Sequence, residues 1–296
     1  MLRIGIVGSE SSHAMQFAKY FNLPDPVTGA VRYEDIRVTA IMGDPDSAAQ
    51  TAAQAQIPQI AESLQELSEM VDAVMITSRR GSEHMAHVKP FLERGMPLFV
   101  DKPFTSNPQE ATAMAKAIEA AGCPVLGGSG CKYCGSILKI KNEVARLTAE
   151  NKLLTAMLHF PIMLDSPYDG FWFYASHLVE MCLEIFGTDI HAVQAMRTVK
   201  CLTANIRYPD FVVSLHFVTE VWETACVLVT DEGAKVISIV TTDSLSEEAM
   251  RFAQLLYGGC KSMTAEELVC PVVLIDAILR AATTGRTIIF TKEVLE

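Results

Sequence analysis

Short apolar runs alternate with helix-like segments along the first 126 residues, and this alternation limits the possible folds more than any other feature of the sequence. The apolar runs read LRIGIV, IRVTAIM, DAVMIT, PLFV and PVLGG. The helical patterns between them lie at 15–21, 47–56, 64–70, 83–94 and 108–121. Such alternation is typical of a parallel sheet that helices cover on both faces. We therefore predict an α/β fold that begins with a doubly wound parallel sheet, and such sheets bind their ligands at the carboxyl edge.

The pattern changes after a helical segment at 133–148. Apolar runs then follow one another with little helix between them, at 153–160, 190–202, 211–218, 225–230 and 234–241. Helical patterns lie at 174–186, 246–257 and 265–282. Strands joined by turns predict an α+β domain with a mostly antiparallel open sheet and helices on one face. The segment GGSG at 127–130 marks the boundary, so we predict one domain over 1–126 and a second over 127–296.

The overall composition excludes several classes of protein. Half of the residues are hydrophobic and 20% are charged, which suits a folded chain with a large core. The net charge of −11, with no run of lysine or arginine, argues against a nucleic-acid partner. No window of about 18 apolar residues predicts a membrane span. Because no secretory signal pattern stands out, we expect a cytoplasmic protein whose eight cysteines are reduced.

The first strand runs into the loop GSESSH, which has one glycine where a dinucleotide-binding loop has three. Gly8 allows the tight turn, while Glu10 and His13 occupy the second and third glycine positions. Ser11 and Ser12 can cap the next helix, and their hydroxyls and the helix N–H groups can hold a phosphate. The carboxylate of Glu10 would repel that phosphate. A strand–loop–helix turn without a ligand therefore remains an equal alternative.

Two further strand ends carry candidate side chains. Asp44, in AIMGDPDS, can accept hydrogen bonds from ribose hydroxyls and repel a 2′-phosphate, which favours NAD over NADP. A simple turn aspartate is the alternative there, with Asp46 capping the following helix. In PLFVDKPFT, Asp101 and Lys102 end a strand at the carboxyl edge, and Pro103 restricts the backbone of Lys102 in a bond that can be cis.

Segments from both halves resemble the family named after glucose–fructose oxidoreductase, inositol dehydrogenase and rhizopine catabolism (Gfo/Idh/MocA). They are RIGIVG, TAIMGDPDSAAQTAAQ, VDAVMITSRRGSEHMAHVKPFLERGMPLFVDKPFT and YASHLVEMCLEIFG. The resemblance implies an N-terminal Rossmann domain that binds NAD or NADP. It also implies a C-terminal α+β domain whose open sheet often mediates oligomer contacts, so we expect a homodimer or homotetramer.

The resemblance also implies roles for individual residues. Lys102 matches the family lysine that hydrogen-bonds the reacting oxygen and the cofactor, where an ammonium stabilises developing alkoxide charge. His177 matches the family histidine that serves as general acid and base, a role that suits an imidazole. Thr77 and Ser78 lie in the loop along which the family passes its cofactor. Asp101 takes the first place of the family's glutamate–lysine–proline motif, and we count it among the cofactor-binding residues.

The chain departs from the family beside the histidine. The family often has an aspartate four residues before it, where this chain has Phe173 within the aromatic segment FWFY. Tyr174, Asp165 or Asp169 could replace that acid, and the surroundings are more apolar than a plain sugar site. Lys132 falls where the family often carries a basic residue that faces the substrate. We count Tyr174 and Lys132 as substrate-binding candidates, although Lys132 could equally be a solvated lysine at a helix start.

Together these features predict an NAD(P)-dependent oxidoreductase that acts on CH–OH groups. It would move a hydride between nicotinamide and a secondary alcohol or carbonyl of a small polyol, sugar or related compound. One alternative is a degenerate family member that acts as a ligand-binding or regulatory protein, and another is non-redox chemistry with a permanently held nucleotide. We predict no metal, because the C-x-x-C at 131–134 has no second pair at zinc spacing.

Overall fold

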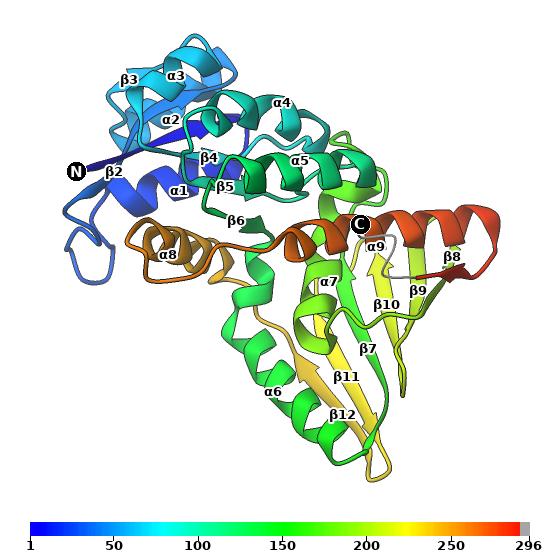
Figure 1. Ribbon diagram of the computed structural model, residues 1–296. Helices are drawn as coiled ribbons and strands as arrows, with labels where there is room; N and C mark the ends of the chain where they lie inside the picture. Colours follow the sequence, from blue (N-terminus) through cyan, green and yellow to red (C-terminus); the bar gives the residue numbers. More distant parts are fainter. Residues whose placement is uncertain (291–296) are drawn as a thin grey trace. The chain divides into compact units, whose positions relative to one another are not determined.

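A computed structural model describes residues 1–290 of the chain, which forms two compact units. The first unit contains Met1–Gly128 and Leu245–Leu268. The second contains Ser129–Ser244 and the described residues from Val269 onward. Each unit has its own sheet (Figure 1). The units differ from the predicted division at 126/127 in two respects. The boundary lies at 128/129, and the segment from Leu245 to Leu268 packs with the first unit.

The first unit has a six-stranded sheet in the order β3-β2-β1-β4-β5-β6, and every neighbouring pair is parallel. This confirms the predicted doubly wound parallel sheet. The strand order reverses between β1 and β4, and such reversals form the ligand-binding crevice of these folds. The strands are β1 (Leu2–Val7), β2 (Ile36–Met42), β3 (Gln59–Ile60), β4 (Ala73–Ile76), β5 (Leu98–Asp101) and β6 (Val125–Gly128). The helices are α1 (Ser12–Asn22), α2 (Pro45–Ala55), α3 (Leu64–Met70), α4 (Gly81–Leu92), α5 (Pro108–Ala120) and α8 (Ser244–Leu256).

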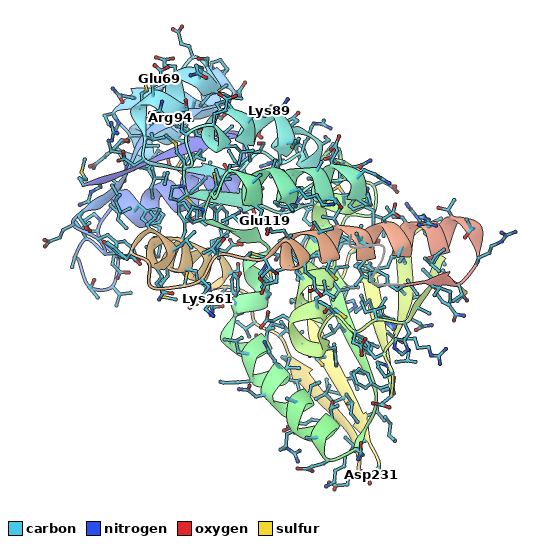
Figure 2. All side chains as sticks on the ribbon, viewed as in Figure 1. Glu69, Lys89, Arg94, Glu119, Asp231 and Lys261 are labelled. Atoms are coloured by element: carbon cyan, nitrogen blue, oxygen red, sulfur yellow. The ribbon has the colours of Figure 1, made fainter. Side chains whose placement is uncertain are left out.

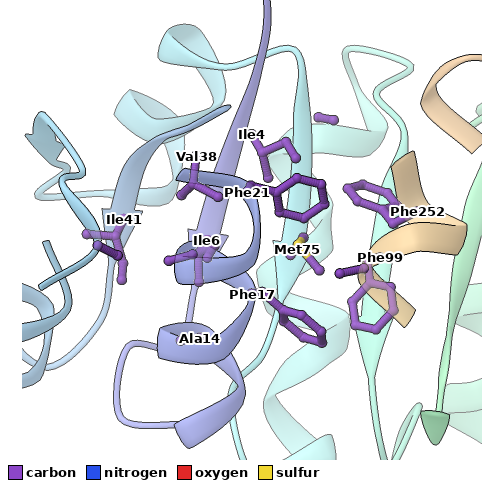
Figure 3. Packing of buried hydrophobic residues seen from close by; sticks show 14 of the residues in the cluster. Ile4, Ile6, Ala14, Phe17, Phe21, Val38, Ile41, Met75, Phe99 and Phe252 are labelled. Carbon is purple, nitrogen blue, oxygen red and sulfur yellow. The ribbon is translucent and has the colours of Figure 1, made fainter. Parts of the chain in front are cut away.

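Aromatic side chains from distant parts of the sequence fill the core of the first unit. Phe17 and Phe21 lie on the buried face of α1, one helical turn apart. The ring of Phe99 on β5 meets Phe17 edge-on at 5.2 Å between centroids and meets Phe252 of α8 at 5.9 Å (Figure 3). Burying one such ring contributes about 1.5–3 kcal/mol. The return of the chain through α8 is therefore part of this core.

Polar residues set the ends and outer faces of the helices. Asn107 accepts a hydrogen bond from the N–H of Glu110 at 3.0 Å, and Pro108 fits the first position of α5. Lys89 on α4 and Glu119 on α5 are exposed, as are the other charged residues labelled in Figure 2. Within residues 1–290, no helix is both long enough and apolar enough to cross a membrane.

The second unit has a seven-stranded sheet in the order β12-β11-β7-β10-β9-β8-β13. Only β7 and β10 pair in parallel, so the predicted mostly antiparallel sheet is confirmed. Its strands are β7 (Leu153–Pro161), β8 (Ala192–Arg197), β9 (Cys201–Arg207), β10 (Val212–Val218), β11 (Ala225–Thr230), β12 (Gly233–Ser238) and β13 (Ile288–Ile289). Its helices are a 3₁₀ turn (Gly130–Tyr133), α6 (Gly135–Ala149), α7 (Phe171–Phe186) and α9 (Ala265–Thr284). The division between the two units falls within α9, after Leu268.

One predicted run of the second unit is wrong. Residues 190–202 form two strands rather than one, because the chain turns sharply between β8 and β9. The N–H of Thr198 donates to the carbonyl of Cys201 at 2.7 Å, and the N–H of Cys201 donates to the hydroxyl of Thr198 at 3.2 Å. A threonine side chain closes this turn, without the glycine or proline that usually marks one in a sequence.

Candidate active site

The carboxyl ends of β1 and β4 approach each other most closely at Gly8. Its φ angle is +96°, and a Cβ atom at this position would lie 2.2 Å from the backbone nitrogen of Ser78. The N–H of Thr77 donates to the carbonyl of Val7 at 2.7 Å, and the hydroxyl of Thr77 donates to the same oxygen at 2.9 Å. Only glycine combines this backbone conformation with this contact. The single glycine that the loop retains is therefore the one that the strand ends require.

Replacing Gly8 by alanine is expected to destabilise the protein by about 4 kcal/mol, because backbone strain and overpacking add together. Gly29 is a matched control, since its φ angle is +70° and a Cβ there would meet nothing within 4 Å. Gly29→Ala should cost only the strain of about 1–2 kcal/mol. Urea unfolding of both variants measures the difference. Equal losses of stability would contradict the close approach at Gly8.

The loop after Gly8 uses its side chains to hold the protein together. Ser11 caps α1, and its hydroxyl accepts from the N–H of His13 at 3.2 Å. Ser12, the first residue of α1, is exposed. The carboxylate of Glu10 accepts from the N–H of Arg79 at 3.2 Å. Glu10 is therefore bonded to the loop after β4, although it occupies the second glycine position.

His13, at the third glycine position, joins α1 to the end of β5. Its Nδ1 lies 2.7 Å from Oδ2 of Asp101, whose Oδ1 accepts from the backbone N–H of Lys102 at 2.7 Å. Asp101 is only 2% exposed. Burial disfavours the charged form of Asp101, but His13 and Lys102 outweigh it and hold the pKa of Asp101 below its ordinary value. Its contribution to stability is therefore present above the unfolded pKa and is lost as the pH falls.

Lys102 is held at the carboxyl edge of the sheet. It is 4% exposed, and the peptide bond between Lys102 and Pro103 is cis. The side chain of Asp101 fixes the backbone N–H of Lys102 directly. Sequence reasoning found Lys102 and Asp101 but missed the role of His13, for which the departure from glycine was the available signal.

Thr77 and Ser78 are both buried, and their hydroxyls bind protein groups. The hydroxyl of Ser78 lies 2.8 Å from Nδ1 of His87, and its carbonyl lies 2.8 Å from Nε2 of His84. Burial, with a smaller contribution from His84, lowers the pKa of His87, which Glu10 opposes. These contacts fix the loop after β4, and a cofactor-binding role for Thr77 and Ser78 stays a prediction.

Asp44, and not Asp46, caps α2, so the predicted cap at Asp46 is wrong. Oδ1 of Asp44 accepts from the N–H of Ser47 at 3.0 Å, and Pro45 takes the first helical position. Ser9 supports this turn, because its hydroxyl donates to the carbonyl of Asp44 at 3.1 Å. Asp44 is exposed, and the cap uses one of its two carboxylate oxygens. Capping and contact with a ribose are therefore compatible.

In the second unit, His177 and Glu180 lie one turn apart on α7 and both contact the segment that precedes α6. Nδ1 of His177 is 2.7 Å from the hydroxyl of Ser129 and 3.6 Å from Sγ of Cys131. Oε2 of Glu180 accepts from the N–H of Ser129 and from Nζ of Lys132, each at 2.8 Å. The ion pair of Lys132 and Glu180 is buried, with side chains 8% and 4% exposed. The substrate-binding role of Lys132 stays a prediction.

Aromatic rings surround His177. Phe160 of β7 lies 5.4 Å from the imidazole and Tyr174 lies 6.5 Å from it, between ring centroids. Phe173, which stands where the family often has an acid, packs against Tyr174 at 4.8 Å and against Tyr168 at 5.3 Å. These contacts place Tyr174 near His177, and its substrate-binding role stays a prediction.

Asp165, a candidate to replace the missing acid, is paired with an arginine. The exposed carboxylate of Asp165 accepts two hydrogen bonds from Arg197, at 2.7 and 2.8 Å. Cys131 and Cys134 are buried thiols. Among residues 1–290, no three His, Cys, Asp or Glu side chains are grouped in a way that could hold a metal ion.

Comparison with known proteins identifies the first unit. Residues 2–129 match the model of the Gfo/Idh/MocA family, described as an oxidoreductase family with an NAD-binding Rossmann fold. No curated protein sequence matches the chain significantly.

Several solved structures share the fold over nearly the whole chain. Scyllo-inositol dehydrogenase from Lactobacillus casei, with NAD(H) and scyllo-inositol, has a TM-score of 0.78 and 13% identity, covering 98% of this chain and 99% of that one. The WlbA dehydrogenase from Bordetella pertussis, with NADH and UDP-GlcNAcA, has a TM-score of 0.77 and 15% identity, covering 98% and 99%. An oxidoreductase from Agrobacterium radiobacter, with NAD⁺, L-tartaric acid and magnesium, has a TM-score of 0.76 and 16% identity, covering 97% and 98%. Residues 2–129 therefore form a domain of the Gfo/Idh/MocA type, which is described as an NAD-binding Rossmann fold of an oxidoreductase family, and the chain shares its fold with these solved structures along nearly its whole length.

Proposed function

We propose that the protein is a dehydrogenase that moves a hydride between nicotinamide and a secondary alcohol or carbonyl of a small polyol, sugar or related compound. The observation that carries this proposal is the buried Lys102, held by Asp101 at the carboxyl edge of a parallel sheet within the family-matched region. An ammonium held at that edge can stabilise an oxyanion, and a preorganised donor of this kind contributes strongly to catalysis.

Three features of the first unit support the binding of a dinucleotide. Gly8 brings the ends of β1 and β4 together, and α1 begins directly beyond the loop with its N–H groups. Asp44 lies just beyond the end of β2 and has an exposed carboxylate that can accept hydrogen bonds from ribose hydroxyls. Bound nicotinamide would supply or accept the hydride. Lys102 would orient and polarise the substrate oxygen, and His177 would give or take its proton.

A fluorescence titration with NADH and NADPH tests nucleotide binding directly, once any nucleotide that co-purifies has been released and identified. We expect micromolar binding of NADH and weaker binding of NADPH, because Asp44 would repel a 2′-phosphate. Asp44→Asn keeps an oxygen for the helix cap and removes the charge. It should therefore lower the ratio of the Kd for NADPH to the Kd for NADH by about tenfold, equivalent to ~1.4 kcal/mol. Asp46→Asn, in the first turn of α2, is the control and should leave the preference unchanged.

The same protein then tests hydride transfer. Consumption of NADH with a panel of small carbonyl compounds, or its formation with polyols and sugars, would support the dehydrogenase. Tight binding without turnover on any of them would favour non-redox chemistry, and no binding of either nucleotide would favour a ligand-binding or regulatory protein. The exposed carboxylate of Glu10 in the nucleotide loop is the observation behind that last alternative.

We further propose that the protein is a homodimer or homotetramer. The outer face of the second sheet carries polar residues such as Ser214 and His216, and exposed apolar residues such as Met196 and Val236. A sheet face of this kind, with apolar side chains left in solvent, suits contact with a second copy. Sedimentation analysis would measure the oligomer size, and a monomer at micromolar concentration would contradict the proposal. The cytoplasmic location stays a prediction.

A further inference from the structure

Ser129 stands between two residues of α7 that lie one helical turn apart. Its hydroxyl is 2.7 Å from Nδ1 of His177, and its backbone N–H donates to Oε2 of Glu180 at 2.8 Å. Ser129 is fully buried, with no exposed surface. Because the backbone N–H of Ser129 is bound to Glu180, the Ser129 hydroxyl is held in a fixed position relative to Nδ1 of His177.

We propose that Ser129 is the positioning residue of His177 and replaces the acidic partner that is missing at Phe173. This inference rests on the proposed function, in which His177 exchanges a proton with the substrate oxygen. The exchange at Nε2 needs Nδ1 to carry a proton both in the imidazolium that donates and in the neutral ring that accepts. The hydroxyl of Ser129 can accept the Nδ1–H bond in both states, so it holds the ring and its tautomer through the proton transfer.

The buried ion pair of Lys132 and Glu180 allows the Ser129 hydroxyl to be removed without releasing the backbone of Ser129. Oε2 of Glu180 binds both the N–H of Ser129 and the ammonium of Lys132, so the turn is fastened to α7 without the Ser129 side chain. The Ser129 hydroxyl also accepts from the N–H of Cys131 at 3.3 Å, which directs it toward His177. Removing the hydroxyl therefore removes its contacts with Nδ1 of His177 and with the N–H of Cys131, while the bond from the Ser129 N–H to Glu180 and the ion pair of Glu180 with Lys132 remain.

A neutral hydroxyl differs from a carboxylate in what it can do for the histidine. It orients the ring, but it lacks the full charge with which an aspartate stabilises an imidazolium. The neighbouring thiol of Cys131, 3.6 Å from Nδ1, offers only a weak alternative partner. Loss of the hydroxyl should therefore affect the tautomer and the chemical step rather than nucleotide binding.

The first test needs no substrate. In protein labelled with ¹⁵N-histidine, long-range ¹H–¹⁵N correlation spectra report the tautomer of each ring, and His177→Gln assigns the signals of His177. We expect one dominant tautomer in the native protein with the proton on Nδ1, a mixture in Ser129→Ala, and recovery in Ser129→Thr, which restores a hydroxyl. Ser176→Ala is the matched control, because Ser176 is also buried and its hydroxyl donates to the carbonyl of Trp172 within α7 at 2.9 Å.

The second test uses turnover. Ser129→Ala should lower kcat by about 10–100-fold, a part of the 10²–10⁴-fold that general acid–base catalysis contributes. The Kd of NADH should stay within a factor of about two, Ser129→Thr should recover most of the loss, and Ser176→Ala should behave as native. Unchanged His177 signals or unchanged kcat in Ser129→Ala would overturn the proposal. A native protein with the expected tautomer but no turnover on any substrate would instead overturn the proposed function and leave the positioning role supported.

Discussion

Replacing Lys102 by methionine is expected to reduce turnover by about 10²–10³-fold while the affinity for NADH changes by less than about threefold. Methionine has similar length and keeps the backbone N–H that donates to Asp101, so the local fold should persist. It lacks the ammonium that would polarise the substrate oxygen at the carboxyl edge of β5. Steady-state kinetics with the best substrate, together with NADH fluorescence titration, measure the two quantities separately.

Lys89→Met provides the control for this experiment. Lys89 is exposed on α4 of the same unit, so its loss removes one positive charge without touching the edge of the sheet. Its kcat and NADH affinity should equal those of the native protein. If Lys102→Met lost turnover and nucleotide affinity to the same extent, Lys102 would be a structural residue, and the catalytic assignment would fail.

Replacing His177 by glutamine is expected to reduce kcat by about 10²–10⁴-fold, since an amide can hydrogen-bond but cannot exchange protons at neutral pH. The limb of the pH–rate profile that reports this histidine should disappear in the variant. His191→Gln, in which an exposed histidine of the same unit changes, should retain both the rate and the profile. The measurement is kcat across a pH series for native protein and both variants.

If the pH–rate profile of His177→Gln kept the limb seen in the native protein, the proton transfer would belong to another group. Tyr174, whose ring lies 6.5 Å from that of His177, would then be the next candidate. Tyr174→Phe separates the two, because it removes the phenol and leaves the aromatic packing against Phe173 intact. The largest expected losses thus fall on one residue in each unit.

The periodicity of the sequence predicts most of the individual strands and helices, but it does not predict which of them pack against one another. The parallel strands of the first unit were predictable because each is a short buried run between helical patterns. The strand β3 was missed because it has two residues, Gln59 and Ile60, both exposed. The amphipathic pattern of α8 predicted a helix with one buried face, but nothing in it says that Phe252 packs against Phe99.

In the candidate site too, local features of the sequence predict single residues but not the contacts between distant ones. Lys102 and Gly8 carry local signals, since a proline follows the first and a strand-to-helix turn contains the second. The pair of His13 and Asp101 joins residues 88 positions apart, and such contacts leave no mark on spacing or composition. The cap at Asp44 was predictable in principle, because a proline favours the first position of a helix and so places the cap one residue earlier.

The path of the chain through α8 has a consequence for synthesis. The first unit starts at Met1, yet its core includes Phe252 and neighbouring residues of α8. During translation the Rossmann sheet emerges first, and domains tend to fold as they leave the ribosome. The surface around Phe99 therefore stays uncovered until α8 has been made, which happens only after strands β7 to β12 of the second unit. The second unit in turn is completed only by residues after Leu268, so neither unit can be completed before most of the other has been synthesised.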